Sequence, residues 1–128
     1  MKHFLIIGFL VFAAFLACNN TSQSKALISA EEMKTMIEKE TPLLIDVRTP
    51  KEFEEGHIKN AKNIDFYSET FKEEMAKLDP NETLLLYCRS GGRSGKTAKI
   101  LQEIGFKKVY DLEGGIIEWK KKGFKLIK

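Results

Sequence analysis

Cysteine is scarce in this chain: of its 128 residues, only Cys18 and Cys88 carry a thiol. The one internal disulfide that it could form would tie the surroundings of Cys88 to the N-terminal leader that holds Cys18. If Cys18 is instead chemically modified, no internal disulfide is possible. Cys88 is then the single free thiol of the mature chain, and its surroundings decide whether it is reactive.

No apolar run reaches the roughly 20 residues that a membrane-spanning helix needs. The run from Phe4 to Leu16 follows a short basic start and has the length of a signal-peptide core. It ends immediately before Ala17 and Cys18, and a polar stretch follows. A small residue and then a cysteine at this point resemble a bacterial lipoprotein signal, although Phe15 and Leu16 depart from the tightest form of that motif.

We therefore predict a lipoprotein-type signal peptide over residues 1–17, a polar tether over residues 18–25 and a folded domain over residues 26–128. On this interpretation Cys18 becomes the lipidated first residue of the mature chain. The protein would be exported and anchored in the bacterial cell envelope, facing the periplasm. An ordinary cleaved signal peptide, with Cys18 nearby by chance, is the alternative.

Strong charge of one sign is also missing. The formal net charge is +3, and its most visible source is the lysine-rich C-terminal end, residues 120–128. No binding motif accompanies these lysines, so a solvated helix face is the simpler interpretation, and no nucleic-acid partner is expected. With 43% hydrophobic and 30% charged residues, the chain has the composition of one ordinary globular domain.

Strand-like apolar runs alternate with helical patterns from about residue 26 onward. We expect strands at 43–45, 61–64, 83–87 and 109–110, and helices that begin near residues 29, 49, 67, 96 and 116. This alternation predicts an α/β fold with a small parallel sheet and helices on both faces. Ligands of such sheets bind beyond the carboxyl ends of the strands, where Asp46 and Cys88 both lie.

The segment from Cys88 to Ser94 lies at a predicted junction between a strand and a helix and reads Cys-Arg-Ser-Gly-Gly-Arg-Ser. Unpaired amides and partial positive charge at a helix N-terminus, together with two arginines, favour the thiolate over the thiol. The two glycines allow a sharp turn that points several amides inward. Ser94 is placed to cap the following helix. The segment predicts a nucleophilic cysteine in a small anion-binding cradle.

Four segments together resemble the rhodanese-like sulfurtransferases in their single-domain form. They occur in the family's order over about residues 26–125 and are Asp46-Val47-Arg48 with the stretch to Ile64, the strand into Cys88, the loop 88–94, and Leu112-Glu113-Gly114-Gly115 with Trp119. The resemblance implies the rhodanese-like α/β fold and the family's persulfide chemistry.

The activity that the resemblance implies is the transfer of a sulfane sulfur in two steps. A donor such as thiosulfate gives its outer sulfur to Cys88, and a thiophilic acceptor, cyanide or a thiol, then removes it, with ping-pong kinetics. The implied partners are these small molecules and, through the lipid anchor on Cys18, a membrane. No metal or other cofactor is expected.

The resemblance also assigns residue roles. Cys88 is the catalytic nucleophile, and the substrate-binding residues are Arg89, Ser90, Gly91, Gly92, Arg93 and Ser94. Arg93 either holds the anion or forms a structural salt bridge. Arg89 either favours thiosulfate or is simply exposed to solvent. Asp46 and Arg48 are expected to form a charge pair near the site, and Glu113 is expected to pair with an arginine.

Two other functions fit parts of the pattern. Cysteine-based phosphatases and arsenate reductases also place a Cys…Arg anion cradle after a strand, but with one more residue between the cysteine and the arginine than separates Cys88 from Arg93. A sulfur-carrier or binding module, whose protein partner defines its role, is the second alternative.

Overall fold

The structure, a computed structural model, describes residues 26–128. The signal peptide and the tether predicted for residues 1–25, with the expected lipidation site Cys18, lie outside the described residues.

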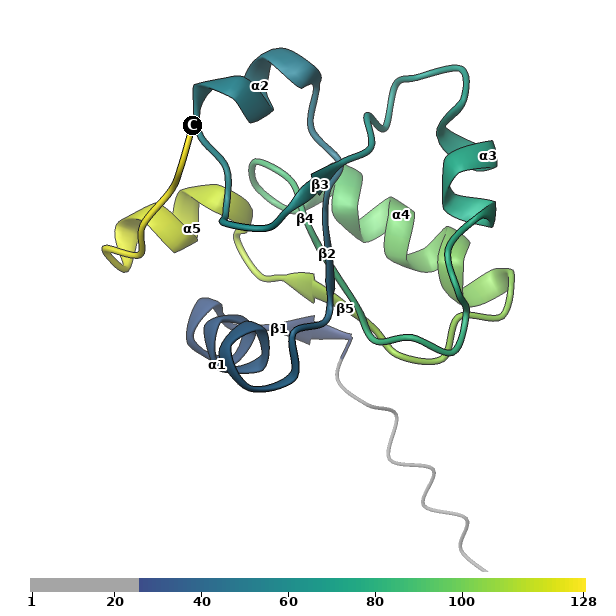
Figure 1. The fold of residues 1–128 in the computed structure, drawn as a ribbon, viewed down its shortest axis with the longest axis horizontal. Helices are drawn as coiled ribbons and strands as arrows, with labels where there is room; N and C mark the ends of the chain where they lie inside the picture. Colours follow the sequence, from purple (N-terminus) through teal and green to yellow (C-terminus); the bar gives the residue numbers. More distant parts are fainter. Residues whose placement is uncertain (1–25) are drawn as a thin grey trace, which may run out of the picture.

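Five strands and five helices alternate along the described chain, and the strands form one parallel sheet in the order β1-β5-β4-β2-β3 (Figure 1). The strands are β1 (Leu27–Ile28), β2 (Leu43–Asp46), β3 (Lys62–Asn63), β4 (Leu84–Tyr87) and β5 (Val109–Leu112). The helices are α1 (Ala30–Glu40), α2 (Pro50–Glu55), α3 (Phe71–Ala76), α4 (Gly92–Glu103) and α5 (Gly115–Lys121). The predicted α/β fold with a parallel sheet is confirmed.

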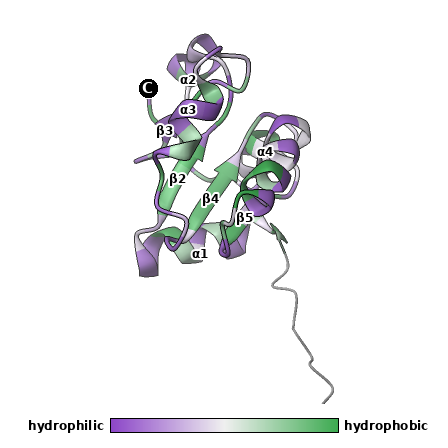
Figure 2. Cartoon of the chain, turned by 90° about the vertical axis from the view of Figure 1, so that its right-hand side faces the viewer, coloured by the Kyte–Doolittle hydropathy of each residue, from purple (hydrophilic) through white to green (hydrophobic). Residues whose placement is uncertain are grey.

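Helices cover both faces of this sheet, as expected for a parallel sheet whose central strand β4 is apolar on both sides. All four residues of β4 are buried, and its side chains alternate between two hydrophobic clusters. One cluster contains residues of α3 and α4, and the other contains residues of α1 and α5. In Figure 1 these helix pairs lie on opposite sides of the strands, and in Figure 2 β2 and β4 are among the most hydrophobic segments.

The structure differs from the predicted elements at three places. The edge strand β1 was not predicted, because its two residues carry no readable period and Leu27 is exposed. Helix α4 begins at Gly92 rather than near residue 96, since the loop glycines themselves form its first turn. Tyr67, which the spacing placed on a helix, precedes α3 and is 68% exposed.

The central position of β4 fixes the place of the loop that follows it. Strands β2 and β5 flank β4 on its two sides, so Cys88 emerges in the middle of the sheet at its carboxyl edge. This is where ligands of open α/β sheets bind. Within residues 26–128, no helix is long and apolar enough to cross a membrane.

Candidate active site

The Cys88 side chain lies in a cradle that its own loop builds. The thiol is buried, with 1% of the residue exposed. The Gly91 amide donates a hydrogen bond to Sγ at 3.1 Å, and the Ser94 hydroxyl donates a second at 3.3 Å. Gly91, with φ 114°, is the residue at which the chain turns into α4, and the left-handed conformation there suits glycine.

This arrangement stabilises the charged form of the thiol. Burial alone raises the pKa of Cys88, but hydrogen bonds from the Ser94 hydroxyl and from the backbones of Ser94, Gly91 and Ser90 outweigh burial, so the pKa lies below its ordinary value. The thiolate is the nucleophilic form of cysteine. The loop therefore holds an activated thiol.

The sequence pattern predicted that Ser94 caps α4, but the structure shows that it does not. The helix begins two residues earlier, with Gly91 in the capping position and no side-chain cap. Ser94 is fully buried in the first turn, and its hydroxyl points back to Cys88 Sγ and to the Gly91 carbonyl at 3.4 Å. Its role is in the thiol environment rather than at the end of the helix.

The backbone of the loop is hydrogen bonded to the first turn of α5. The Ile116 amide donates to the Cys88 carbonyl at 2.9 Å, and the Ile117 amide donates to the Arg89 carbonyl at 3.2 Å. Gly115 permits this close approach: a Cβ at that position would lie 2.4 Å from the Arg89 carbonyl oxygen. The first turn of α5 thus holds the loop 88–94 by its backbone.

Gly115→Ala is expected to destabilise the domain by about 2–4 kcal/mol, because the methyl group collides with backbone atoms at a φ of 60° that favours glycine. Gly123→Ala is the matched control, since Gly123 also has positive φ (78°) but nothing lies within 4 Å of its added Cβ. We expect this control to lose only about 1 kcal/mol. Urea unfolding of both variants measures the difference, and equal losses would contradict the proposed contact.

Arg93 is held by a carboxylate from α2. Its guanidinium donates two hydrogen bonds to Glu52, at 2.7 and 2.9 Å, in the bidentate geometry typical of strong Arg–carboxylate pairs. The same Glu52 closes the capping box of α2, because it also accepts from the backbone amide and hydroxyl of Thr49. The guanidinium also lies 5.8 Å from the ring centre of Tyr67.

The Glu52–Arg93 pair predicts a pH dependence of stability. The pKa of Glu52 is lowered from 4.5 to about 2, first by the Arg93 hydrogen bonds. A lowered carboxylate pKa contributes stability that is present above the unfolded value and is lost as the pH falls through the folded value. We expect the stability advantage of the wild type over Glu52→Gln to shrink from pH 4.5 to about pH 2. If urea unfolding gives the same stability difference between the wild type and Glu52→Gln across this pH range, the stabilising role of the ion pair is contradicted.

Asp46 and Arg48 form a buried ion pair beneath the site. The Arg48 guanidinium donates to the Asp46 carboxylate at 2.7–3.0 Å and to the Gly56 carbonyl at 2.7 Å. Asn63 donates to the backbone carbonyls of Asp46 and Arg48, which ties β3 to the same turn. The expected charge pair is present, and among the described residues no hydrogen bond or ion pair joins Asp46 to the loop 88–94.

A cavity of about 210 Å³ lies beside the loop. Arg48 and Glu52 line it from the α2 side, Ile116 and Lys120 from α5, and Arg89 from the loop itself. Arg89 is exposed to solvent, as is Ser90. Cationic side chains thus line the cavity, while Arg93 is paired with Glu52 and is not among its lining residues.

Residues 29–122 match the family described as Rhodanese-like domain. The chain belongs to the rhodanese-like family. A rhodanese-related protein from Thermoplasma volcanium superposes with a TM-score of 0.70 at 28% identity, over 78% of this chain and 95% of that one. A Rhodanese-like domain protein from Staphylococcus aureus gives a TM-score of 0.67 at 29% identity, over 80% of this chain and 98% of that one.

A curated relative, the tRNA uridine(34) hydroxylase of Hamiltonella defensa, is 38% identical over 106 residues. This match covers 78% of the present chain but 29% of the relative. The rhodanese-like chain therefore spans about three tenths of the length of such relatives. The similarity concerns the shared domain.

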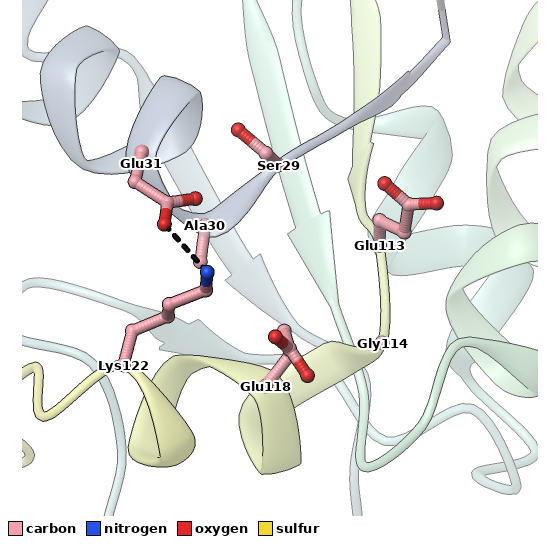
Figure 3. Close-up of a pocket in the computed structure, with 7 residues that line it drawn as sticks. All are labelled: Ser29, Ala30, Glu31, Glu113, Gly114, Glu118 and Lys122. Atoms are coloured by element: carbon pink, nitrogen blue, oxygen red, sulfur yellow. Dashed lines mark ion pairs between the residues drawn. The ribbon is translucent and has the colours of Figure 1, made fainter.

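Glu113 lies away from the loop 88–94 of this rhodanese-like domain. It is exposed and lines a cavity between the start of α1 and α5, with Ser29, Glu31, Glu118 and Lys122 (Figure 3). In that cavity Glu31 pairs with Lys122 at 2.9 Å. Among the described residues no ion pair joins Glu113 to an arginine, so the expected pairing is not found.

The sequence assigned no role in the site to Glu52 and Gly115, which contribute to it, or to Asp111, which lies against the first turn of α4. Glu52 had a local signal, the Thr-Pro-x-Glu pattern of a capping box, but nothing in it pointed to Arg93. Gly115 was part of a predicted turn and of a segment that carries the family resemblance, but its contact with the loop 88–94 was not predicted. Asp111, on β5, is 4% exposed and carries a carboxylate oxygen without a partner. An acidic residue in an apolar strand was the available signal.

Among the described residues, no cluster of His, Cys, Asp or Glu suited to a metal ion is found.

Proposed function

We propose that this rhodanese-like domain is a sulfurtransferase that moves a sulfane sulfur from thiosulfate, or a similar donor, to a thiophilic acceptor through a persulfide on Cys88. The observation that carries the proposal is the buried Cys88 Sγ, which receives hydrogen bonds from Gly91 and Ser94 and has a lowered pKa. A thiolate held in this way is ready to attack an electrophilic sulfur without a general base.

In the first half-reaction the Cys88 thiolate attacks the outer sulfur of thiosulfate. A new S–S bond forms, the bond between the two donor sulfurs breaks, and sulfite leaves with the electron pair. In the second half-reaction cyanide or a thiolate attacks the outer sulfur of the persulfide. The Cys88–sulfur bond then breaks, and the Cys88 thiolate is restored as the leaving group. Neither step needs an added oxidant, reductant or cofactor.

The loop supplies the stabilisation that both steps need, because both involve anions at the same position. The backbone amide of Gly91 and the hydroxyl of Ser94 already face Sγ. Donors fixed before the reaction stabilise developing charge without reorganisation. The exposed Arg89 and Lys120, which line the cavity beside the loop, attract an anionic donor such as thiosulfate by their charge.

Arg93 in this proposal shapes the cradle more than it binds the donor. Both of its terminal nitrogens are engaged by Glu52, which also raises the pKa of Arg93. The pair fixes the first turn of α4, from which Ser94 reaches Cys88. This supports the structural salt bridge over direct anion binding as the main role of Arg93.

The kinetic test is the initial rate of thiocyanate formation with thiosulfate and cyanide varied together. We expect parallel lines in double-reciprocal plots, because sulfite leaves before the acceptor reacts. Intersecting lines would indicate a ternary complex and contradict the persulfide route. Saturation only at unrealistically high thiosulfate would favour the alternative in which the domain carries sulfur for a protein partner.

The phosphatase and arsenate reductase alternative has little support from the site. The loop holds one residue fewer between Cys88 and Arg93 than those enzymes have, and Arg93 is occupied by Glu52. A smaller cradle favours a single sulfur atom over a tetrahedral oxyanion. Turnover of para-nitrophenyl phosphate that disappears in Cys88→Ser would support this alternative.

The activity named for the longer relatives is not part of the proposal, because this chain matches about three tenths of their length. The match supports sulfur chemistry on the shared rhodanese-like domain and does not cover the rest of those relatives.

We also propose that the domain acts in the bacterial cell envelope, held to a membrane by a lipid on Cys18. The support is the sequence of the leader, in which an apolar core ends in Ala-Cys before a polar stretch. Intact-mass measurement of the mature protein from membranes of a bacterial host should show a chain that begins at a lipidated Cys18. A mature chain that begins elsewhere, or retains residues 1–17, would contradict the anchor.

A further inference from the structure

Asp111 is a buried acidic residue for which the proposed sulfur transfer has assigned no role. It lies on β5, in register with Leu86 of β4 and Leu27 of β1. Only 4% of the residue is exposed, and its Oδ1 atom has no hydrogen-bond partner. Buried polar atoms are nearly always paired, so an unpaired carboxylate oxygen requires an explanation.

The carboxyl group lies against the first turn of α4. A Cβ placed on Gly95 would be 3.7 Å from Asp111 Oδ2. Burial raises the pKa of Asp111 to about 6, and hydrogen bonding from the Ser94 hydroxyl and the Leu112 amide opposes that rise. Asp111 thus lies against the helical turn that carries the Ser94 hydroxyl, which donates to Cys88 Sγ.

Among residues 26–128, no charged side chain competes for Asp111 from the elements packed around it. The neighbouring strands β1 and β4 contain no charged residue. Tyr87, the one titratable residue of β4, belongs to the hydrophobic cluster on the other face of the sheet. On α4, Arg93 is held by Glu52, and the remaining charged residues, Lys96, Lys99 and Glu103, are exposed. The titratable group that the Ser94 hydroxyl contacts is the Cys88 thiol.

The proton count makes the Ser94 hydroxyl a selector among its acceptors. In the structure it contacts Cys88 Sγ and the Gly91 carbonyl, and Asp111 lies beside the same turn. A serine hydroxyl has one hydrogen to donate and can accept one in return. If Asp111 is protonated, it can donate to Ser94, whose own hydrogen remains on Cys88 Sγ. If Asp111 is ionised, its carboxylate competes for the Ser94 hydrogen, and the thiolate loses a donor.

We propose that Asp111 is a positioning residue of the reaction, whose carboxyl group decides whether the Ser94 hydroxyl is directed to Cys88 or away from it. The proposal deepens the proposed function, since it rests on Cys88 as the nucleophile. It predicts that the reactivity of Cys88 depends on the protonation of Asp111 and that this dependence passes through Ser94.

The test is the pH profile of Cys88 alkylation by iodoacetamide in the full chain, followed by mass analysis of the Cys88-containing peptide. Alkylation forms a bond from sulfur to carbon and releases iodide, so it requires no sulfur donor or acceptor. In the wild type we expect an inflection near pH 6 in addition to that of the thiol. Asp111→Asn should remove it and change the rate at neutral pH about twofold or more.

Ser94→Ala distinguishes the proposed route from a purely electrostatic effect. In Ser94→Ala the inflection near pH 6 should be absent, and adding Asp111→Asn should change nothing further. The control Asp79→Asn, at an exposed position, should keep the wild-type profile. An inflection that persists in Asp111→Asn, or an equal effect of Asp111→Asn with and without Ser94, would overturn the proposal.

If Asp111→Asn fails to fold, carbon-13 NMR titration of the Asp111 carboxyl in the wild type gives the same answer. Alkylation of Cys88 removes the thiolate charge, so the pKa of Asp111 should fall. An unchanged Asp111 titration would overturn the coupling. A failure of sulfur transfer with this coupling intact would count against the proposed function alone.

Discussion

Replacing Cys88 by serine is expected to lower the rate of thiocyanate formation from thiosulfate and cyanide at least about a thousandfold. A serine hydroxyl is not ionised at neutral pH and forms no persulfide. The change is otherwise small, because the Gly91 amide that donates to Sγ at 3.1 Å can donate equally to an oxygen. We therefore expect the thermal unfolding midpoint to stay close to that of the wild type.

The matched control is the same substitution at the other thiol. Cys18→Ser should keep the rate of sulfur transfer, because Cys18 precedes the segment that matches the family. Substantial activity in Cys88→Ser would contradict a persulfide at this residue. A comparable loss in Cys18→Ser would indicate that the two thiols act together.

The second large effect concerns stability and arises from the buried charge pair. Arg48→Met leaves the Asp46 carboxylate, which is 0% exposed, without its partner. Breaking a buried ion pair in this way costs about 3–5 kcal/mol, because the remaining charge stays desolvated. A domain of this kind has only about 5–15 kcal/mol of stability, so the variant should unfold at a much lower urea concentration.

A double variant separates the charge effect from the loss of packing. Adding Asp46→Asn to Arg48→Met removes the uncompensated charge, and the double variant should be more stable than Arg48→Met alone. Such non-additivity is expected for residues in direct contact. Urea unfolding of the two single variants and the double variant measures the coupling. Additive losses would show that Arg48 contributes by packing and by its bond to Gly56 rather than by its charge.

The sequence allowed much of this fold to be predicted, because the two central strands, β2 and β4, are short continuous apolar runs, and the helices after them have recognisable starts. It did not allow β1 to be predicted, since an edge strand of two residues is specified by its pairing with β5 and not by its own pattern. Nor did it give the start of α4, where the helix continues into residues that look like a glycine-rich turn.

The site was predictable where its parts are neighbours in the chain. Cys88 and the amides of its loop follow from one short motif. The contacts from Glu52 to Arg93 and from α5 to the Cys88 carbonyl join residues that lie far apart in sequence, so only the folded chain reveals them. Ser94 was placed correctly in the loop but was given the wrong task, because its role depends on where α4 begins.

The most direct test of the persulfide account is intact-mass analysis of the protein after exposure to thiosulfate. The account predicts that the chain gains the mass of one sulfur atom, that cyanide removes it with release of thiocyanate, and that Cys88→Ala gains nothing. No mass change in the wild type, or the same gain in Cys88→Ala, would contradict it.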